Sequence, residues 1–317
     1  PMVGRFRIPE GIDFVRIPGM IKKTNTLYVP HSIKVEPHLA LSIRRDIITA
    51  TTKAFRPCLF IVDKVPLGLK QEVEPALRWL KEESPHTKVV LGLRDILDDP
   101  ESTIADWQRK NIIQVLEELY SEIWIYGNQD IYDPVKEYAI PPHIAEKTIF
   151  TGYIPRHIPA SNGARKKKKL IVVTTGGGGD GFPILEAYVK MLEDNPDFPH
   201  KTLIVSGPFV ARDKLDELAE RARAQKASFL TFTKNMEKKF GQADLIISMG
   251  GYNTMCEILS AKKPSLIIPR ETPRVEQLIR ARIFKEHGLA DYLPWPELSP
   301  ENLLAKIKLL LGGADSA

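Results

Sequence analysis

The sequence predicts an α/β protein with parallel sheets, arranged as two Rossmann-like domains. Two patterns support this prediction. Short apolar runs rich in Ile, Val and Leu recur along the chain, as in strands that are buried on both faces, at residues 58–63, 88–93, 122–126, 148–151, 170–175, 202–206, 244–249 and 265–269. Amphipathic stretches lie between these runs and have the pattern of helices that connect parallel strands, at residues 71–83, 103–119, 184–192, 213–224, 253–261, 275–287 and 300–310.

A change in composition between the fourth and fifth apolar runs indicates a domain boundary. This segment is dense in Pro, Gly and small polar residues and ends in four lysines, 166–169, which we interpret as part of a solvated linker. We therefore expect an N-terminal domain over residues 1–151, a linker over 152–169 and a C-terminal domain over 170–317.

Composition narrows the class of protein. The chain has 317 residues, enough for two domains, and its 45 basic and 40 acidic residues leave a net charge of +5. This mild excess is spread along the chain, unlike the concentrated basic surface of a nucleic-acid binder. The two cysteines, Cys58 and Cys256, suggest neither disulfides nor a metal site. Because no apolar run reaches the roughly 18 residues of a membrane span and no signal peptide is recognisable, we expect a cytoplasmic protein.

The apolar run 170–175 leads into a glycine-rich turn, Gly176 to Gly181, and then into a helix start. Backbone N–H groups in such a turn, together with the positive end of the following helix, form an anion site. We therefore expect Gly177, Gly178 and Gly179 to bind a diphosphate. NAD is a poor fit because the next strand does not end in the acidic residue that binds a dinucleotide ribose. A tight turn without a ligand stays the alternative.

A second glycine turn and helix start follow the third apolar run of the C-terminal domain. Gly250 and Gly251 open this helix, and Asn253 and Thr254 offer donors from its first turn. Glu257 follows on the same helix, and its carboxylate can accept hydrogen bonds from two vicinal hydroxyls, such as those of a ribose. Alternatively, Asn253 and Thr254 are helix caps and Glu257 is a solvated helix residue.

These residues carry a resemblance to a known family. The pattern Ser-x-Gly-Gly-x-x-Thr-x-x-Glu over 248–257 is followed by Lys-Pro-x-Leu-x-x-Pro over 263–269 and by a polar loop that ends at Glu276 and Gln277. This ordered set resembles the donor site of the MurG-like GT-B glycosyltransferases. The resemblance runs from Gly152 to the end of the chain.

The resemblance implies how a UDP-sugar donor is held. Glu257 would bind the ribose, and the glycine turn before it, with Thr254, would face the diphosphate. The stretch 229–236 is similar to the family's loop beside the base, so Phe232 and Met236 would border the uracil. Arg156 matches an arginine after the family's linker strand and would compensate the diphosphate charge.

At the sugar end, the resemblance implies that Glu276 and Gln277 contact the transferred group. Two departures leave the identity of the sugar open. The glycine turn 176–179 lacks the serine usual in the family, and Glu276 stands where a second glutamine is expected.

The activity implied is that of a UDP-sugar-dependent hexosyltransferase that moves a sugar to an unidentified hydroxyl acceptor, with inversion and without a metal. The UDP-sugar is a co-substrate, and no further cofactor or nucleic-acid partner is expected. Peripheral contact with the inner face of the membrane stays open. A UDP-sugar epimerase or hydrolase of the same fold, or a non-catalytic subunit that binds a nucleotide sugar, is the alternative.

GT-B enzymes carry the acceptor site and the general base in the N-terminal domain. The glycine-rich turn that follows the first strand of such a domain is not recognisable, so we expect this domain to lack its first βαβ segment. Asp63 and Asp95 are the candidate bases because each directly follows a predicted strand. A turn or cap aspartate is the alternative for both, and an ion pair with Arg94 is a further alternative for Asp95.

Overall fold

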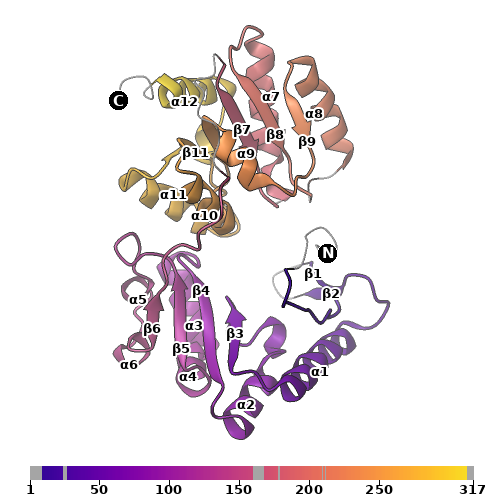
Figure 1. Ribbon diagram of the computed structural model, residues 1–317, viewed down its shortest axis with the longest axis vertical. Coiled ribbons are helices and arrows are strands. Elements are labelled where there is room, and N and C mark those ends of the chain that lie inside the picture. Colours follow the sequence, from indigo (N-terminus) through magenta and orange to yellow (C-terminus); the bar gives the residue numbers. More distant parts are fainter. Residues whose placement is uncertain are drawn as a thin grey trace. The chain divides into compact units, whose positions relative to one another are not determined.

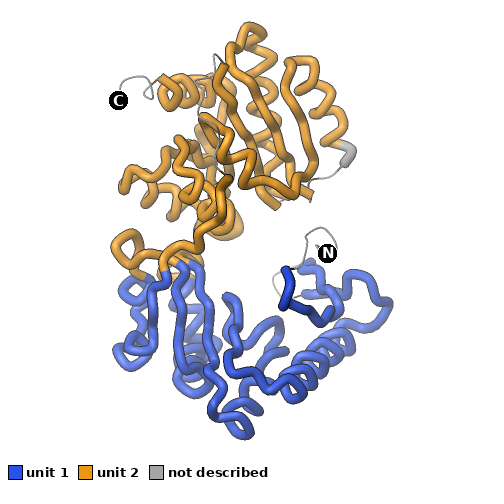
Figure 2. The backbone as a smooth tube through the Cα atoms, in the orientation of Figure 1, with its two compact units in different colours: residues 1–94, 103–126, 134–151 blue, residues 95–102, 127–133, 152–317 orange. Residues whose placement is uncertain are grey.

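The computed structural model describes residues 9–23, 27–159, 168–177, 179–208, 210 and 212–312. The chain divides into two compact units, coloured separately in Figure 2. Unit 1 comprises residues 1–94, 103–126 and 134–151, and unit 2 comprises residues 95–102, 127–133 and 152–317. Two loops from the first half of the chain, 95–102 and 127–133, thus group with unit 2.

Unit 1 is built on a four-stranded parallel sheet in the order β3-β4-β5-β6. Its strands are β3 (Leu59–Asp63), β4 (Lys88–Arg94), β5 (Glu122–Tyr126) and β6 (Thr148–Phe150). In register, Asp63 lies opposite Gly92 and Arg94 lies opposite Tyr126. The side chains at these strand ends therefore gather at one carboxyl edge.

Helices and a small hairpin accompany this sheet (Figure 1). They are β1 (Met20–Lys22), β2 (Tyr28–Pro30), α1 (Pro37–Phe55), the 3₁₀ turn η1 (Leu69–Gln71), α2 (Glu74–Glu83), α3 (Pro100–Arg109), α4 (Ile112–Leu119), α5 (Pro134–Glu137) and α6 (Pro142–Ala145). The single helix predicted over 103–119 is two helices, because Asn111 adopts a left-handed conformation with φ 51°. Asparagine tolerates this conformation better than most residues.

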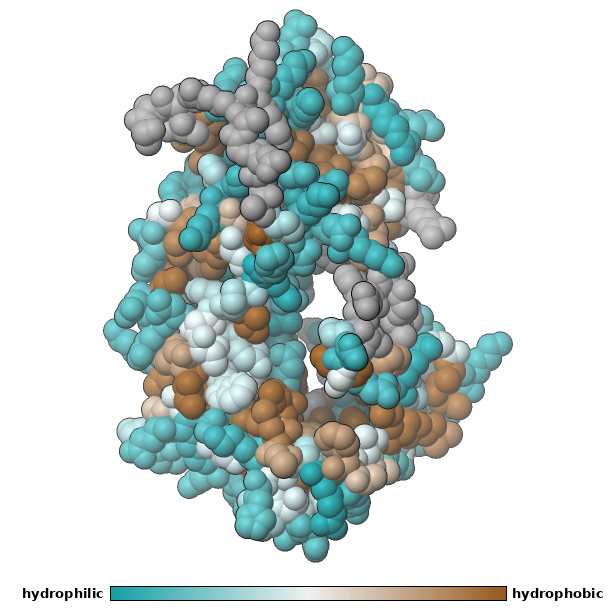
Figure 3. All heavy atoms as spheres, in the orientation of Figure 1, coloured by the Kyte–Doolittle hydropathy of each residue, from teal (hydrophilic) through white to brown (hydrophobic). Residues whose placement is uncertain are grey.

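The β3 edge of the sheet is unusually apolar. Within the described residues β3 pairs on one side only, and the side chains of Leu59 and Ile61 are 44% and 47% exposed. Of the fifteen exposed large apolar residues described, eleven lie between Ile12 and Val65. Apolar surface is visible over α1 in Figure 3. The run 58–63, which predicts a strand buried on both faces, is therefore buried on one face only.

Unit 2 contains a six-stranded parallel sheet in the order β12-β11-β10-β7-β8-β9. Its strands are β7 (Leu170–Thr174), β8 (Lys201–Val205), β9 (Ser228–Leu230), β10 (Leu245–Ser248), β11 (Ser265–Ile267) and β12 (Asp291–Tyr292). The chain winds outward from β7 in one direction and from β10 in the other. Open α/β sheets bind ligands where the strand order reverses in this way, beyond the carboxyl ends of the two central strands.

Helices cover both faces of this sheet (Figure 1). They are the 3₁₀ turn η2 (Gly179–Gly181), α7 (Phe182–Asp194), α8 (Arg212–Ala224), α9 (Met236–Gln242), α10 (Tyr252–Ala261), α11 (Glu276–Glu286), the 3₁₀ turn η3 (Trp295–Glu297) and α12 (Pro300–Gly312).

Alternate residues of β7 explain why both faces are covered. Ile171 and Val173 pack into one buried cluster with α7, α8 and α12, whereas Val172 packs into the other with α9, α10 and α11. Two parallel sheets with helical crossovers confirm the predicted α/β class with two Rossmann-like domains. Across the described ranges, no helix has the length and apolar character needed to cross a membrane.

Candidate functional site

The structure places the two glycine turns side by side in unit 2. The turn after β7 and the turn after β10 leave neighbouring strands, which pair in register with Thr174 opposite Ser248. Both turns therefore lie at the carboxyl edge, where the strand order reverses. The helix α10 begins directly after the second turn, so its first amide N–H groups face this edge without partners inside the helix.

A small pocket of about 120 Å³ occupies this position. The turn after β7 contributes Thr175, Gly176, Gly177 and Asp180, the turn after β10 contributes Met249, Gly251 and Thr254, and the loop after β11 contributes Arg270 and Gln277. Four of these nine, namely Gly177, Gly251, Thr254 and Gln277, belong to the donor site expected from the sequence. Arg270 and Asp180 are additions that the sequence analysis missed.

Two glycines allow close packing of the backbone at this edge of the sheet. At Gly207, which follows β8 with φ 84°, a β-carbon would lie 2.0 Å from the carbonyl oxygen of Gly176. At Gly250, with φ 80°, a β-carbon would lie 2.7 Å from a methyl group of Ile267. At both positions the backbone is left-handed and there is no space for a β-carbon, so only glycine is accommodated without strain.

Of the other glycines predicted for the donor site, Gly179 and Gly250 do not line the pocket. Gly179 belongs to the 3₁₀ turn η2 and is exposed, and it does not line the pocket. Gly250 sits one residue before the lining residue Gly251, and its carbonyl oxygen accepts a hydrogen bond from Arg280 at 3.1 Å. Gly178 lies outside the described residues. Of the glycines described in the first turn, Gly176 and Gly177 line the pocket.

Glu257 is partly buried on α10, beyond Asn253 and Thr254. Burial and, to a smaller extent, the charge of Glu237 raise the pKa of its carboxyl group to about 7, and the charge of Arg156 opposes the rise. A carboxylate in this state titrates near neutral pH. Asn253 is exposed at the start of α10 and does not line the pocket.

The predicted contacts to the uracil base, Phe232 and Met236, and the predicted diphosphate contact Arg156 do not line the pocket. Met236 is the first residue of α9 and packs against the cluster that contains α10, and Glu237, which acts on Glu257, follows it. Phe232 lies partly buried in the loop before α9. Arg156 is exposed, and its backbone N–H donates to the Ser260 hydroxyl of α10 at 2.9 Å.

Polar side chains from three segments meet at the pocket end formed by the loop after β11. The Arg270 guanidinium pairs with Glu276 at 2.7 Å and with Asp180 at 3.2 Å. The Arg270 backbone N–H donates to the side-chain carbonyl oxygen of Gln277 at 3.1 Å. The structure thus brings the predicted sugar contacts, Glu276 and Gln277, together around a cation.

The two candidate bases differ in their surroundings. Asp95 is 1% exposed and accepts two hydrogen bonds from the Arg280 guanidinium, at 2.6 and 2.8 Å. Both carboxylate oxygens are thus engaged by one buried cation, and this geometry favours a structural role for Asp95. The guanidinium that pairs with Asp95 belongs to Arg280. Asp63 is exposed at the end of β3, and its charge, after burial, contributes to a raised pKa of Tyr126.

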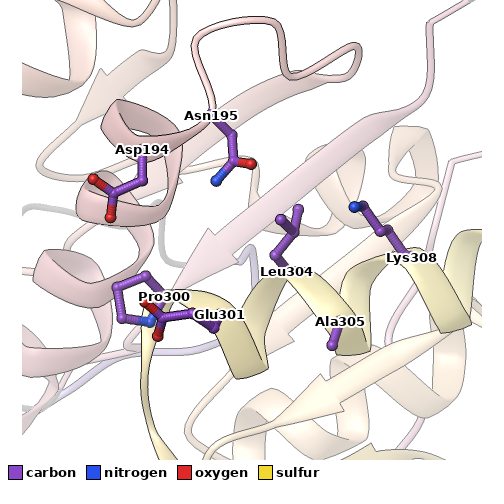
Figure 4. Close-up of a pocket in the computed structure, with 7 residues that line it drawn as sticks. All are labelled: Asp194, Asn195, Pro300, Glu301, Leu304, Ala305 and Lys308. Atoms are coloured by element: carbon purple, nitrogen blue, oxygen red, sulfur yellow. The ribbon is translucent and has the colours of Figure 1, made fainter.

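A larger pocket of about 340 Å³ lies elsewhere in unit 2 (Figure 4). It opens between the end of α7, at Asp194 and Asn195, and the first turns of α12. The Asp194 carboxylate already pairs with Lys190, and the Asn195 amide donates to a backbone carbonyl of α7. This groove is at the opposite end of α7 from the glycine turn, so we do not regard it as the donor site. In the part of the chain that is described, no cluster of three or more His, Cys, Asp or Glu residues could hold a metal ion.

Comparison with known proteins agrees with this geometry. Residues 170–316 match the model described as the glycosyltransferase family 28 C-terminal domain. The UDP-N-acetylglucosamine--N-acetylmuramyl-(pentapeptide) pyrophosphoryl-undecaprenol N-acetylglucosamine transferase of Lachnospira eligens is 34% identical over 84 residues, 26% of this chain and 24% of that protein. The enzyme of the same name from Streptococcus agalactiae serotype Ia is 42% identical over 76 residues, 23% of this chain and 21% of that protein. The matched segments thus span about a quarter of each curated relative.

Solved structures share the fold over most of the chain. MurG of Acinetobacter baumannii superimposes with a TM-score of 0.56 and 14% identity, covering 89% of this chain and 75% of that one. The UDP-GlcNAc 2-epimerase of Neisseria meningitidis bound to UDP-GlcNAc superimposes with a TM-score of 0.56 and 13% identity, covering 89% and 76%. Residues 170–316 therefore match the glycosyltransferase family 28 C-terminal domain, and the chain resembles the MurG-like GT-B glycosyltransferases, most strongly over those residues.

Proposed function

We propose that this protein is a UDP-sugar-dependent glycosyltransferase that transfers a hexosyl group to a hydroxyl acceptor. The observation that carries the proposal is the pocket at the reversal of strand order in unit 2, where two glycine turns, the start of α10 and the polar loop after β11 converge. The match of residues 170–316 to the family 28 domain supports the same activity.

Each part of this site has a chemical task. The Gly176–Gly177 turn and the amide groups at the start of α10 bind the diphosphate, because aligned N–H groups and the helix dipole favour negative charge. Ionised Glu257 accepts hydrogen bonds from the ribose hydroxyls, with Phe232 and Met236 beside the base. Gln277 and Glu276 contact the sugar. The donor is a co-substrate, and the chemistry proposed here uses no further cofactor.

The transfer step is a direct displacement at the anomeric carbon. The acceptor oxygen forms the new bond, the bond to the diphosphate oxygen breaks, and its electron pair leaves with UDP, so the configuration inverts. Asp63 takes the acceptor proton as general base. The amide groups around the diphosphate, together with Arg156, stabilise the charge that develops on the leaving group, and no metal is needed in this scheme.

Isothermal calorimetry tests the donor site directly. The wild-type protein should bind UDP, and Glu257→Ala should bind UDP at least about tenfold more weakly, because two hydrogen bonds to a charged acceptor are lost. Glu286→Ala is the matched control, since Glu286 is an exposed glutamate of α11 in the same unit. Failure of the wild type to bind UDP, or equal binding by Glu257→Ala, would reject the proposal.

The fold alone does not separate transfer from epimerisation, since solved UDP-GlcNAc 2-epimerases superimpose as well as MurG does. The family 28 match favours transfer. Incubation with UDP-N-acetylglucosamine and no acceptor distinguishes the cases: an epimerised nucleotide sugar identifies an epimerase, and rapid release of free sugar identifies a hydrolase. Binding without any turnover would identify a non-catalytic subunit.

The names of the curated relatives specify an undecaprenol-linked acceptor. By analogy we propose a hydroxyl acceptor at the inner face of the membrane, with the enzyme in peripheral contact. Co-sedimentation with anionic phospholipid vesicles checks this contact, and recovery of all the protein in the supernatant would count against it.

A further inference from the structure

A charged cluster of three side chains closes one end of the donor pocket. Arg270 follows β11, Asp180 belongs to η2 in the first glycine turn, and Glu276 begins α11. The Arg270–Glu276 pair is largely shielded, with side chains 22% and 17% exposed, whereas Asp180 is 56% exposed. Arg270 and Asp180 both line the pocket. The cluster therefore presents one inner and one outer carboxylate around a single guanidinium.

Two buried atoms of this cluster lack hydrogen-bond partners within the described residues. They are Nε of Arg270, a donor, and Oε2 of Glu276, an acceptor. Both belong to side chains that already form an ion pair through their other atoms. An unsatisfied buried polar atom is costly unless a ligand or a local shift satisfies it. The cluster therefore has unused donor and acceptor capacity beside a pocket.

A hydroxyl group fits this unused capacity best, because it donates and accepts at once. A fully ionised phosphate oxygen can only accept a hydrogen bond, so it would satisfy Nε of Arg270 alone. An ammonium group can only donate one, so it would satisfy Oε2 of Glu276 alone. Gln277 adds to the same pattern, since its carbonyl oxygen is occupied by the Arg270 N–H and its amide group is left to donate. Sugars present several hydroxyls at such spacing, so the chemistry matches the transferred sugar better than the diphosphate.

The charge of the cluster adds a second constraint. One guanidinium and two carboxylates sum to a negative charge, and partial burial weakens the screening of that charge by water. A carboxylate on the sugar would meet net repulsion here. We propose that Arg270, Asp180 and Glu276 select a neutral, hydroxylated sugar on the donor and reject a sugar acid. This inference rests on the proposed function and goes beyond it by naming the substrate class and by adding Arg270 and Asp180 to the sugar contact Glu276.

The experiment compares UDP-glucose with UDP-glucuronate, which differ only in a hydroxymethyl group and a carboxylate, and uses UDP alone as the reference. Calorimetry on the wild type should give at least about tenfold tighter binding of UDP-glucose than of UDP-glucuronate. Glu276→Gln, which removes one negative charge at constant size, should reduce that ratio several-fold. Arg270→Gln should weaken UDP-glucose about tenfold, the effect of one hydrogen bond to a charged group. Both variants should bind UDP as the wild type does, which also shows that they are folded.

Arg274→Gln is the matched control, because Arg274 lies in the same loop, is half exposed and does not line the pocket. Equal binding of the two nucleotide sugars by the wild type would overturn the inference. So would an Arg270→Gln variant that loses affinity for UDP as strongly as for UDP-glucose, since Arg270 would then bind the diphosphate. Absence of UDP binding by the wild type is a different result, which rejects the proposed function itself.

Discussion

Asp95 and Arg280 form a bidentate ion pair in which each side chain is only 1% exposed, although they lie 185 positions apart in the chain. The same guanidinium donates to the carbonyl oxygens of Gly250 and Ile96, at 3.1 and 3.3 Å. Burial lowers the pKa of Arg280 and Asp95 raises it, with a net rise. One arginine thus ties the segment after β4 to α11 and to the glycine turn before α10.

We expect Asp95→Ala to destabilise unit 2 by about 3–5 kcal/mol, because it leaves a buried guanidinium without its counter-charge. Replacing both partners, with Asp95→Leu and Arg280→Met, should cost less than the single change. The measurement is urea unfolding followed by circular dichroism.

Asp194→Ala is the control for this experiment. It removes the Lys190 pair, whose side chains are 53% and 41% exposed, and should change stability by less than about 1 kcal/mol. Equal effects of Asp95→Ala and Asp194→Ala would show that the buried pair does not hold this part of the structure together.

Donor binding should depend on pH near neutrality through Glu257. Its pKa of about 7 means that the carboxyl group is mostly protonated at pH 6 and mostly ionised at pH 8. Only the ionised form accepts hydrogen bonds from both ribose hydroxyls, so affinity should fall as the pH falls, by about tenfold between these two conditions. UDP-glucose is the suitable probe, because its diphosphate lacks the terminal phosphate that titrates near pH 6 in UDP.

Two variants test whether Glu257 is the group that causes this pH dependence. Glu257→Gln should bind weakly and without pH dependence over the same range. Glu237→Gln should move the midpoint to lower pH, because the charge of Glu237 raises the pKa of Glu257. A wild-type affinity that is flat between pH 6 and pH 8 would mean that Glu257 does not bind the donor in its ionised form.

The strands predicted best are those whose residues are buried on both faces. The apolar run 170–175 coincides with β7, and the run 244–249 contains β10. The strands β9 and β12, of three and two residues, were missed because neither lies within a longer apolar run, whereas the three residues of β11 lie within the run 265–269. The break at Asn111 was also missed, because apolar periodicity continues across it and only the backbone angle reveals it.

The candidate site was predictable where its chemistry is local in sequence. A glycine turn followed by a helix start is visible in the residues themselves, as at Gly250 and Gly251. Partners distant in sequence were not visible: Asp180 meets Arg270 across 90 residues, and Asp95 meets Arg280 across 185. An aspartate after a strand has the same local pattern whether it is exposed, as Asp63 is, or paired and buried, as Asp95 is.

The approach of β8 to the first glycine turn gives a steric prediction. Gly207→Ala should destabilise the protein by about 1–3 kcal/mol, because the new methyl group would meet the Gly176 carbonyl oxygen and the backbone has a positive φ. It should also weaken UDP binding by displacing Gly176 and Gly177.

Gly251→Ala provides the contrast. Gly251 has φ −61°, and a β-carbon there meets nothing within 4 Å, although the residue lines the pocket. The thermal unfolding midpoint of the Gly251→Ala variant should match that of the wild type, while its affinity for UDP should fall because the methyl group narrows the pocket. If Gly207→Ala melts at the wild-type temperature, the tight contact described above is not a constraint on the fold.

Asp63 is the remaining candidate base, and its test separates catalysis from binding. We expect Asp63→Asn to reduce turnover about 10²–10⁴-fold, the usual contribution of a general base, while UDP-glucose binds as tightly as to the wild type. Turnover is followed as the slow background release of UDP from UDP-N-acetylglucosamine with water in place of the acceptor, a rate well below the rapid sugar release that would identify a hydrolase. Asp46→Asn is the matched control, since Asp46 is an exposed aspartate of α1 in the same unit. Because Asp63 lies outside unit 2, which contains the donor pocket, a loss of donor affinity equal to the loss of turnover would show that Asp63 supports the structure and is not the base.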